Sequence, residues 1–424
     1  MKGAFEDIPQ HWQLSRVDRV ASVNARIGWK ALTAAEYQDE GYAFLSTPNI
    51  KLAEIDFENV NFISEFRYEE SPDLKLTVGD VLLAKDGNTL GIVNIVRDLP
   101  RPATVNGSIA VLRAHSIEPN FLRYVIASDV TQSAISAVKG GMGVPHLFQW
   151  DINRLAVPLP PAQEQRLISN YLDAEVACIE EVVRARRAQL NLLDRRLSVV
   201  RDVLVGEYSE KFPIAPLRRF IRRIEQGASP QCDNTPAEVG EWGVLKLSSV
   251  KRGTFIAEEN KRLPEPENVI GQYEVKSGDL LVTRANTPDL VGDVAVVRET
   301  CSHRLLPDLI YRVSLDSNLD GNYVAEVALG SRIRELVKAD ARGSSQSMVK
   351  LRGEDIKNWP VPVADELAQQ QLVSAMREAT RATAQLKSVI QRQINLLTER
   401  RRSLITAAVT GQIDVVTARG VRVP

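Results

Sequence analysis

The sequence predicts an α+β protein in which two mixed α/β domains are joined by two long antiparallel coiled-coil helices, as an internal pseudo-two-fold repeat. Three observations predict this fold. The chain repeats itself at an interval of about 200 residues. Each repeat opens with short β-branched runs separated by turn residues. Each repeat then closes with a long segment whose apolar residues follow a heptad.

The repeat is clearest in two helix-like stretches, "QLNLLDRRLSVVRDVLVG" from Gln189 and "QINLLTERRRSLITAAVTG" from Gln393. Upstream of them, "DINRLAVPLPPAQEQRLIS" corresponds to "DIKNWPVPVADELAQQQLVS", with one residue inserted. A third pair, "VGDVLLAKDGNTLG" and "SGDLLVTRANTPDLVG", occurs in the same order. We therefore interpret the chain as a duplication, with the first repeat ending near Gly206 and the second near Gly411.

The β-rich part of each repeat is predicted to form a domain. Runs such as "DVLLA", "GIVNIV" and "SIAVLRA" are divided by Asp-Gly, Asn-Gly and Pro-containing turns. The predicted boundaries place domains at residues 1–160 and 207–362, helices at 161–206 and 363–412, and a tail at 413–424.

The two helices are predicted to pack on each other along apolar seams with alternating steps of four and three residues. Because the first helix leads from the first domain to the second, a second helix that packs along it must run back. The alternative is two amphipathic helices that each pack on their own domain. A helix of about 40 residues spans roughly 60 Å. The seam positions are Leu172, Val176, Ile179, Val183, Arg186, Leu190, Leu193, Leu197, Val200 and Leu204, then Leu372, Met376, Ala379, Thr383, Leu386, Ile390, Gln393, Leu397, Arg400, Leu404 and Ala407.

Composition indicates a soluble, cytoplasmic, globular protein. The chain has 424 residues, of which 44% are hydrophobic and 25% charged. No apolar run approaches the length of a membrane span. The three Cys and four His residues are scattered, which argues against a disulfide framework or a metal site. A formal charge of −1 argues against nucleic-acid binding through bulk electrostatics alone.

Catalytic motifs are absent from the sequence, so we expect no enzyme activity and no cofactor of its own. There is no phosphate-binding loop, dinucleotide fingerprint, nucleophile elbow or adenine-gripping Pro-Pro motif. Glu274 and Lys276, with Glu265 upstream, match the carboxylate pattern of some metal-dependent nucleases. A Gly-Asp turn before a strand explains this stretch without catalysis.

Polar residues in the turn-rich parts of both repeats are candidates for reading DNA bases, since Arg, Lys, Asn and Gln form the paired hydrogen bonds that identify guanine and adenine. The loops "KGGMGVPHLFQ" and "ARGSSQSMVK" occupy equivalent places in the two repeats. The second helix is modestly basic and is a candidate for contact with the DNA backbone. The candidate DNA-binding residues are Asn49, Lys85, Asn88, His146, Gln149, Lys246, Arg284, Asn286 and Gln346.

The arrangement resembles the specificity subunit of type I restriction–modification systems over nearly the whole chain. "HWQLSRVDRV" is similar to the start of a target recognition domain in that family, and "VGDVLLAKDG" and "SGDLLVTRAN" resemble its Gly-Asp-strand element. "VPLPPAQEQRLISNYLD" is similar to the start of its first spacer helix, and "LITAAVTGQIDV" is typical of its end. In the second repeat, "VPVADELAQQQLV" lacks the second proline and the Glu-Gln pair.

This resemblance implies a DNA-binding subunit whose two target recognition domains read a bipartite, asymmetric site in double-stranded DNA. It also implies assembly with two modification subunits, which methylate adenine, and with restriction subunits, which translocate and cut DNA. S-adenosylmethionine, ATP and Mg are then expected on those partners. The alternative function is a non-enzymatic coiled-coil adaptor that joins two protein-binding domains.

Overall fold

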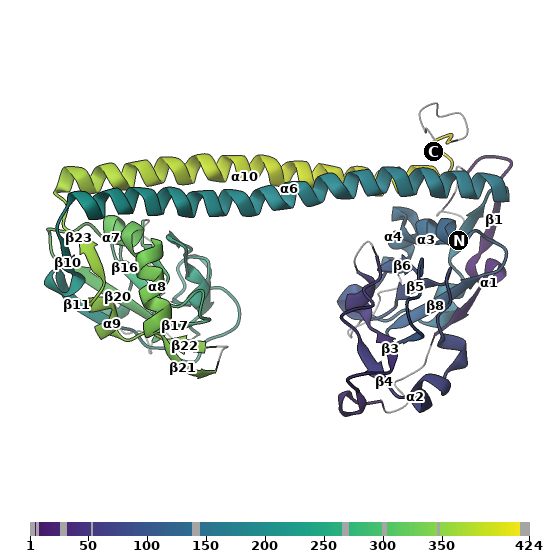
Figure 1. Ribbon diagram of the computed structural model, residues 1–424, viewed down its shortest axis with the longest axis horizontal. Coiled ribbons are helices and arrows are strands. Elements are labelled where there is room, and N and C mark those ends of the chain that lie inside the picture. The colour runs from purple at the N-terminus through teal and green to yellow at the C-terminus, as the bar shows by residue number, and fades with distance from the viewer. Residues whose placement is uncertain are drawn as a thin grey trace. The chain divides into compact units, whose positions relative to one another are not determined.

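The computed structural model describes residues 5, 8–25, 32–51, 54–137, 145–264, 271–298, 303–345 and 348–415. The chain divides into two compact units. Unit one comprises Met1–Arg187 and Gln391–Pro424, and unit two comprises Ala188–Ile390. Each unit mixes strands and helices, and the predicted α+β class with two long helices is confirmed (Figure 1).

Unit one contains a four-stranded antiparallel sheet in the order β2-β8-β5-β6 and a three-stranded sheet in the order β4-β3-β7, in which β3 and β7 are parallel. Strand β1 pairs with β9 at the approach to the first long helix. In Figure 1, helices α3 and α4 lie between the four-stranded sheet and the long helices. The elements are β1 Gln13–Arg16, α1 Val17–Val20, β2 Ala21–Asn24, β3 Tyr42–Leu45, β4 Asn61–Ile63, α2 Glu65–Glu69, β5 Val81–Ala84, β6 Val93–Ile95, β7 Ala103–Val105, β8 Ile109–Ala114, α3 Pro119–Ala127, α4 Asp129–Ala137, α5 Gln149–Asn153 and β9 Ala156–Leu159.

Unit two repeats this topology, with sheets in the orders β11-β20-β16-β18 and β15-β12-β19 and with β10 paired to β23. The duplication therefore extends to the β-rich domains, where the sequences differ most. The elements are β10 Ile214–Pro216, β11 Ile221–Gln226, β12 Gly243–Leu245, β13 Val250–Lys251, β14 Thr254–Phe255, β15 Asn260–Arg262, β16 Leu280–Thr283, β17 Ala285–Asn286, β18 Val294–Val296, β19 Arg304–Leu305, β20 Ile310–Leu315, α7 Gly321–Ala328, α8 Ser331–Asp340, β21 Arg342–Ser345, β22 Met348–Lys350, α9 Gly353–Lys357 and β23 Pro360–Pro362.

The Gly-Asp pairs that precede β5 and β16 are explained by backbone geometry and by one carboxylate in each unit. Gly79 and Gly278 have φ values of +95° and +92°, which side-chain-bearing residues rarely adopt. The buried Asp80 carboxylate accepts a hydrogen bond from the Thr77 amide at 2.8 Å and pairs with Arg113 at 2.8 Å. In unit two, the Asp279 carboxylate likewise accepts from the Lys276 amide and pairs with an arginine of β20. The shared sequence element is thus a turn that fixes the start of the central strand.

The long helices are α6, Ala162–Lys211, and α10, Glu366–Val409. For comparison, the boundaries predicted from sequence were 161–206 and 363–412. In unit one, Arg401 near the end of α10 pairs with Glu180 in α6 at 2.7 Å. In unit two, Lys387 pairs with Asp194 further along α6 at 2.8 Å. Residue numbers rise along one helix as they fall along the other, so the predicted antiparallel pairing is confirmed.

The seam of α6 was predicted correctly, but that of α10 was wrong by one residue at several positions. The α6 seam positions are all buried or half-buried. In α10, Leu386 is 47% exposed, and Lys387 is half-buried in its place. Likewise Gln393 is exposed, whereas Ile394 is only 4% exposed. The pattern also moves from Arg400 to Arg401 and from Ala407 to Ala408.

This shift has a simple helical explanation. After Thr383, α10 takes a second consecutive step of four residues, which is equivalent to a four-residue insertion in the heptad pattern. A straight helix has 3.6 residues per turn rather than 3.5, so the extra step restores the direction of the seam. It also buries the apolar Ile394 in place of the polar Gln393.

A glutamine near the start of each long helix makes the same hydrogen bonds in both repeats. Gln165 accepts a hydrogen bond from the Glu118 amide and donates one to the Pro160 carbonyl, both at 2.8 Å. Gln369 makes equivalent bonds, accepting from the Asp320 amide at 2.8 Å. The second repeat therefore keeps the hydrogen-bonding glutamine although the motif around it has changed.

Candidate nucleic-acid interface

In each unit, the end of the central strand is a junction of three segments. The Lys85 carbonyl accepts a hydrogen bond from the Leu147 amide, and the Lys85 amide donates to the Ser108 carbonyl, both at 2.8 Å. Arg284 is held in the same way by Leu351 and Leu309, again at 2.8 Å. The loops that follow β5 and β16 are thus tied to the approach to α5 and α9. We call these loop clusters, residues 85–89 with 145–150 and residues 284–287 with 348–352, the unit-one rim and the unit-two rim.

The unit-one rim brings together four of the predicted residues, which differ in exposure. Asn88 and Gln149 are exposed and His146 is half-buried. Lys85 is buried, with its ammonium 3.7 Å from the Asp86 carboxylate. The same carboxylate binds the His146 ring through Nδ1. Asp86 therefore holds both basic side chains in place.

Asn49 does not join this rim. It is 4% exposed, and its carboxamide accepts a hydrogen bond from the Ser46 amide and donates one to the Asn59 carbonyl, each at 2.8 Å. Because its polar atoms serve the domain interior, Asn49 presents no free edge to a base in this structure. The prediction for Asn49 followed from its residue type and its place in a turn-rich stretch, and overlooked that Ser-Thr-Pro-Asn favours a capped turn.

In unit two, Lys246 lines a small cavity, and Arg284 contacts Asp308, another residue of its lining. Lys246 is half-buried and lines a cavity of about 360 Å³ together with Lys261 and Asp308. The Arg284 guanidinium donates to the Asp308 carbonyl at 3.4 Å. Asn286, in β17 beside β22, is half-buried. Gln346 lies outside the described residues.

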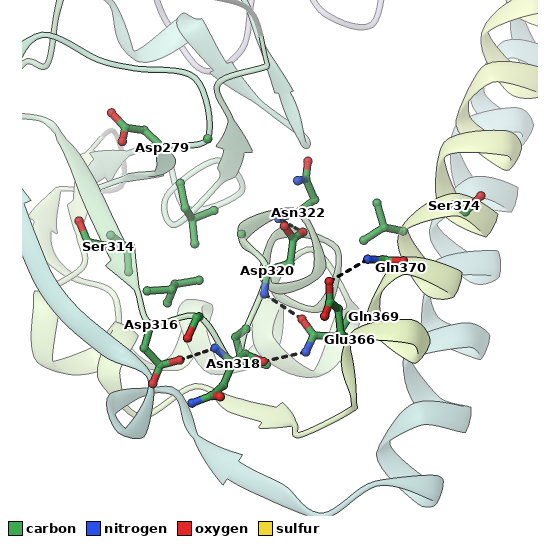
Figure 2. Close-up of a pocket in the computed structure, with 18 of the residues that line it drawn as sticks. Asp279, Ser314, Asp316, Asn318, Asp320, Asn322, Glu366, Gln369, Gln370 and Ser374 are labelled. Carbon is green, nitrogen blue, oxygen red and sulfur yellow. Dashed lines mark hydrogen bonds between the residues drawn. The ribbon is translucent and has the colours of Figure 1, made fainter.

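A larger cavity in unit two, of about 630 Å³, has the wrong charge for a DNA backbone (Figure 2). Carboxylates of Asp279, Asp316, Asp320 and Glu366 line it, together with the guanidinium of Arg377. Repulsion between carboxylates and phosphates excludes it as the candidate interface.

Glu274, which belongs to the nuclease-like pattern, has a structural role in this fold. The Glu274 carboxylate accepts a hydrogen bond from the His303 amide at 2.8 Å, which joins two loops. Glu265 lies outside the described residues. Within the described ranges, no group of three His, Cys, Asp or Glu side chains is arranged to hold a metal ion. Over the same ranges, no helix is long and apolar enough to cross a membrane.

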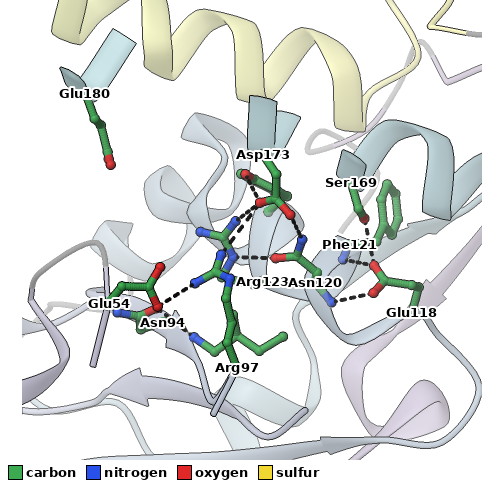
Figure 3. A network of polar contacts seen from close by, with 12 residues as sticks. Glu54, Asn94, Arg97, Glu118, Asn120, Phe121, Arg123, Ser169, Asp173 and Glu180 are labelled. Atoms are coloured by element: carbon green, nitrogen blue, oxygen red, sulfur yellow. Dashed lines mark hydrogen bonds and ion pairs between the residues drawn. The ribbon is translucent and has the colours of Figure 1, made fainter. Parts of the chain in front are cut away.

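A polar network anchors the unit-one domain to α6, and sequence reasoning missed it (Figure 3). Asp173 of α6 accepts hydrogen bonds from Asn120 at 2.6 Å, from Arg123 at 3.1 Å and from the Tyr124 hydroxyl at 2.7 Å. Arg97 approaches it at 3.6 Å. Burial raises the pKa of Tyr124 above its ordinary value, so the phenol stays a donor. The only sequence signal was an acidic residue next to the predicted seam of the helix.

Comparison with known proteins identifies this architecture. Residues 9–192 match the type I restriction modification DNA specificity domain. The chain is 22% identical to the EcoKI specificity subunit of Escherichia coli K12, over 96% of this chain and 90% of that protein. It is 30% identical to the Escherichia coli EcoEI specificity subunit, over 41% of this chain and 29% of that protein. A solved chain of a type I restriction–modification system has the same fold, with a TM-score of 0.66, 16% identity and coverage of 96% of this chain and 99% of that chain.

The fold places unlike loops on a scaffold that is repeated in the two units. Residues 9–192 carry the DNA specificity domain of type I restriction–modification systems, and the whole chain resembles the specificity subunits of these systems, as the sequence indicated. Its role is to supply DNA sequence specificity, and the adaptor alternative is set aside.

Proposed function

We propose that this chain reads a bipartite, asymmetric site in double-stranded DNA, with one half contacted by the unit-one rim and the other by the unit-two rim. The observation that supports this is the shared backbone frame around Lys85 and Arg284, which carries different side chains in the two units. Similar frames with different donors and acceptors are suited to reading different bases with one docking geometry.

The residues proposed to contact bases are the exposed or half-buried members of the predicted set. In unit one these are Asn88, His146 and Gln149 of the rim. In unit two they are Arg284 and Asn286 of the rim and, outside it, Lys246 at the cavity that Asp308 also lines. Asn and Gln match the donor and acceptor edge of adenine, whereas Arg and Lys match guanine. Gln149 also donates one amide hydrogen to the Val23 carbonyl at 2.5 Å, which leaves its other amide hydrogen and its carbonyl oxygen for a base.

Partner subunits complete the proposed function. The net charge of −1 leaves this chain without an excess of cations to neutralise phosphates. We propose that two modification subunits, and restriction subunits where they are present, embrace the duplex and carry the S-adenosylmethionine, ATP and Mg. The complex is expected in the cytoplasm. The purified chain alone is expected neither to methylate nor to cleave DNA, and methyl transfer by the isolated chain would refute this part of the proposal.

Exchange of one domain tests the bipartite model. Residues up to Pro158 are replaced by the corresponding domain of another specificity subunit, and the chimera is expressed with its modification subunit. Methylation mapping should show one half of the recognised site changed and the other half unaltered. The unmodified chain is the control. A chimera that assembles but changes both halves would show that the domains do not read independently.

A further inference from the structure

Two large aromatic side chains project from the unit-one rim into solvent. Phe148 and Trp150 are 53% and 54% exposed, with ring centroids 6.2 Å apart and planes within 14° of parallel. The His146 ring meets the Phe148 ring edge-on at 4.4 Å. We call His146, Phe148 and Trp150 the aromatic ledge. Single exposed apolar residues are ordinary, but adjoining aromatic rings mark an interaction surface.

The exposure of these rings is imposed by the fold. Leu147 and Ile152, which flank them in sequence, are fully buried in the unit-one core. The Phe148 amide donates to the buried Asp151 carboxylate at 3.0 Å, which fixes the start of α5. With its neighbours anchored inward and its first turn capped, α5 holds both rings outward.

The ledge is continuous with the loop that carries the proposed base contacts. The Gly87 amide donates to the Pro145 carbonyl at 2.8 Å, and Asp86 forms a bridge with His146. At the other end, the Arg154 guanidinium lies 5.2 Å from the centre of the Trp150 ring. Flat apolar faces beside a cation suit a nucleobase and its phosphate, because bases stack on aromatic rings while Arg neutralises the backbone.

Among the described residues of unit two, the equivalent place has no such ledge. The Arg352 amide donates to Asp355 at 2.8 Å just as Phe148 donates to Asp151, so Arg352 corresponds to Phe148. By the same correspondence Glu354 takes the place of Trp150, and its side chain is largely exposed. The surface that is aromatic in unit one is charged in unit two, so the two rims differ in chemistry as well as in base-reading residues.

We propose that the aromatic ledge stacks on a nucleobase in the half-site read by unit one, as an apolar wedge at a base step. This inference rests on the proposed function. Inserting such a wedge partly unstacks the step, and stacking of the freed base on the rings offsets that cost. The unit-two rim itself is then expected to unstack no base in its half-site, apart from the adenine that a modification subunit extrudes for methylation.

The test uses the complete complex with its modification subunit and the target found by methylation mapping. 2-Aminopurine, whose fluorescence rises when it is unstacked, replaces one base at a time in each half-site, except at the adenines that the modification subunits methylate, because methyltransferases themselves extrude the target base. For the wild-type complex, a rise at these positions is expected in the unit-one half-site only, at the base that loses its stacking neighbour to the rings, because a probe stacked on the rings stays quenched. Combined Phe148→Ala and Trp150→Ala should abolish the rise and weaken binding about 10- to 100-fold, the range expected from losing a base stack.

Matched variants separate stacking from loss of structure. Phe148→Tyr with Trp150→Phe keeps both rings and should retain binding. Phe66→Ala removes an aromatic side chain that is 72% exposed on α2, outside the rim, and should leave binding unchanged. The slope of affinity against salt concentration should not change in the double alanine variant, because the rings contact no phosphate.

Three outcomes would overturn the inference in distinguishable ways. If the wild-type complex binds its target but the double alanine variant binds equally well, the ledge does not stack and the proposed function stands. If the variant loses its modification subunit while assembled complexes bind DNA normally, the ledge is a protein-docking face. If the wild-type complex shows no preference for any DNA site, the proposed function fails and the inference fails with it.

Discussion

Arg201 of α6 forms a buried ion pair with Glu326 of α7, with Nε and Oε2 3.0 Å apart, and the equivalent position in unit one is apolar. The equivalence is set by two hydrogen bonds. Asp202 accepts from the first amide of α8, and Thr406 accepts from the first amide of α4. Ile405 therefore takes the place of Arg201 and belongs to the unit-one core. The same helix position therefore forms an ion pair with the domain in unit two and an apolar contact with the core in unit one.

Removing one partner of this pair should destabilise unit two. Glu326→Ala leaves the Arg201 cation buried and unpaired, which costs about 3–5 kcal/mol. Replacing both residues, by Arg201→Ile and Glu326→Leu, should restore most of the stability because no charge is left buried. Urea unfolding measures the free energy of unfolding of the single and the double variant. Hydrogen exchange of α7 shows whether the change lies in unit two. An equal loss in the single and double variants would mean that packing, not charge, explains the effect.

The capping contacts of α4 and α8 should act locally. Asp202→Ala removes the acceptor for the Ser331 amide, 2.7 Å away, and should cost about 1 kcal/mol. Thr406→Ala does the same for the Asp129 amide, 2.9 Å away. Hydrogen exchange should show faster opening of the first turn of α8 in the first variant and of α4 in the second. Each variant is the control for the other, and a change in both helices would contradict local capping.

The corrected seam of α10 predicts a contrast between neighbouring residues. Ile394→Ala should lower the free energy of unfolding by about 2–4 kcal/mol, because the side chain is buried and its loss leaves a cavity. Gln393→Ala should change it by less than about 0.5 kcal/mol, because that side chain is exposed. Thermal or urea unfolding of the two variants is the measurement. A larger loss of stability in Gln393→Ala than in Ile394→Ala would mean that the seam predicted from the heptad is the correct one.

Stability should fall in alkaline solution because of a buried phenol. Burial raises the pKa of Tyr323 above its ordinary value of 10.0 in unit two. The folded state therefore favours the neutral phenol, so its contribution is full below pH about 10 and is lost as pH rises further. Tyr323→Phe loses the hydrogen bond to the Pro362 carbonyl but cannot ionise. The stability gap between wild type and variant in urea unfolding should narrow from pH about 9 to about 11, and parallel curves would exclude this cause.

A change in helix length tests whether the long helices set the spacing of the half-sites. Inserting four helix-forming residues between Ala185 and Gln189 lengthens α6 by about 6 Å, slightly more than one turn. The half-sites should move apart by one or two base pairs, at about 3.4 Å each, with the bases of each half unchanged. Two inserted residues rotate the later seam by about 200° and should abolish assembly. Methylation at the original spacing by the four-residue variant would rule out this role.

Features that depend on local pattern could be predicted from the sequence. Repeated Gly-Asp turns, β-branched runs and heptads specify turns, strands and helices through neighbouring residues, so the duplication and the α6 seam were accessible. Asn88 and Gln149 could be placed at the surface because polar residues in loops are ordinarily exposed. The α10 seam was missed because a single step of four after Thr383 does not alter the apolar composition, only the direction in which later residues face.

Which polar residues are free to act depends instead on contacts between distant parts of the chain. Asn49 and Lys85 were chosen by residue type, yet both are buried by contacts with residues outside their own strands or turns. The aromatic ledge exists because the residues on either side of it find partners in the core, which forces Phe148 and Trp150 outward. The anchor Asp173 depends on a helix brought from another part of the chain. Such contacts join residues far apart in sequence, and no local pattern encodes them.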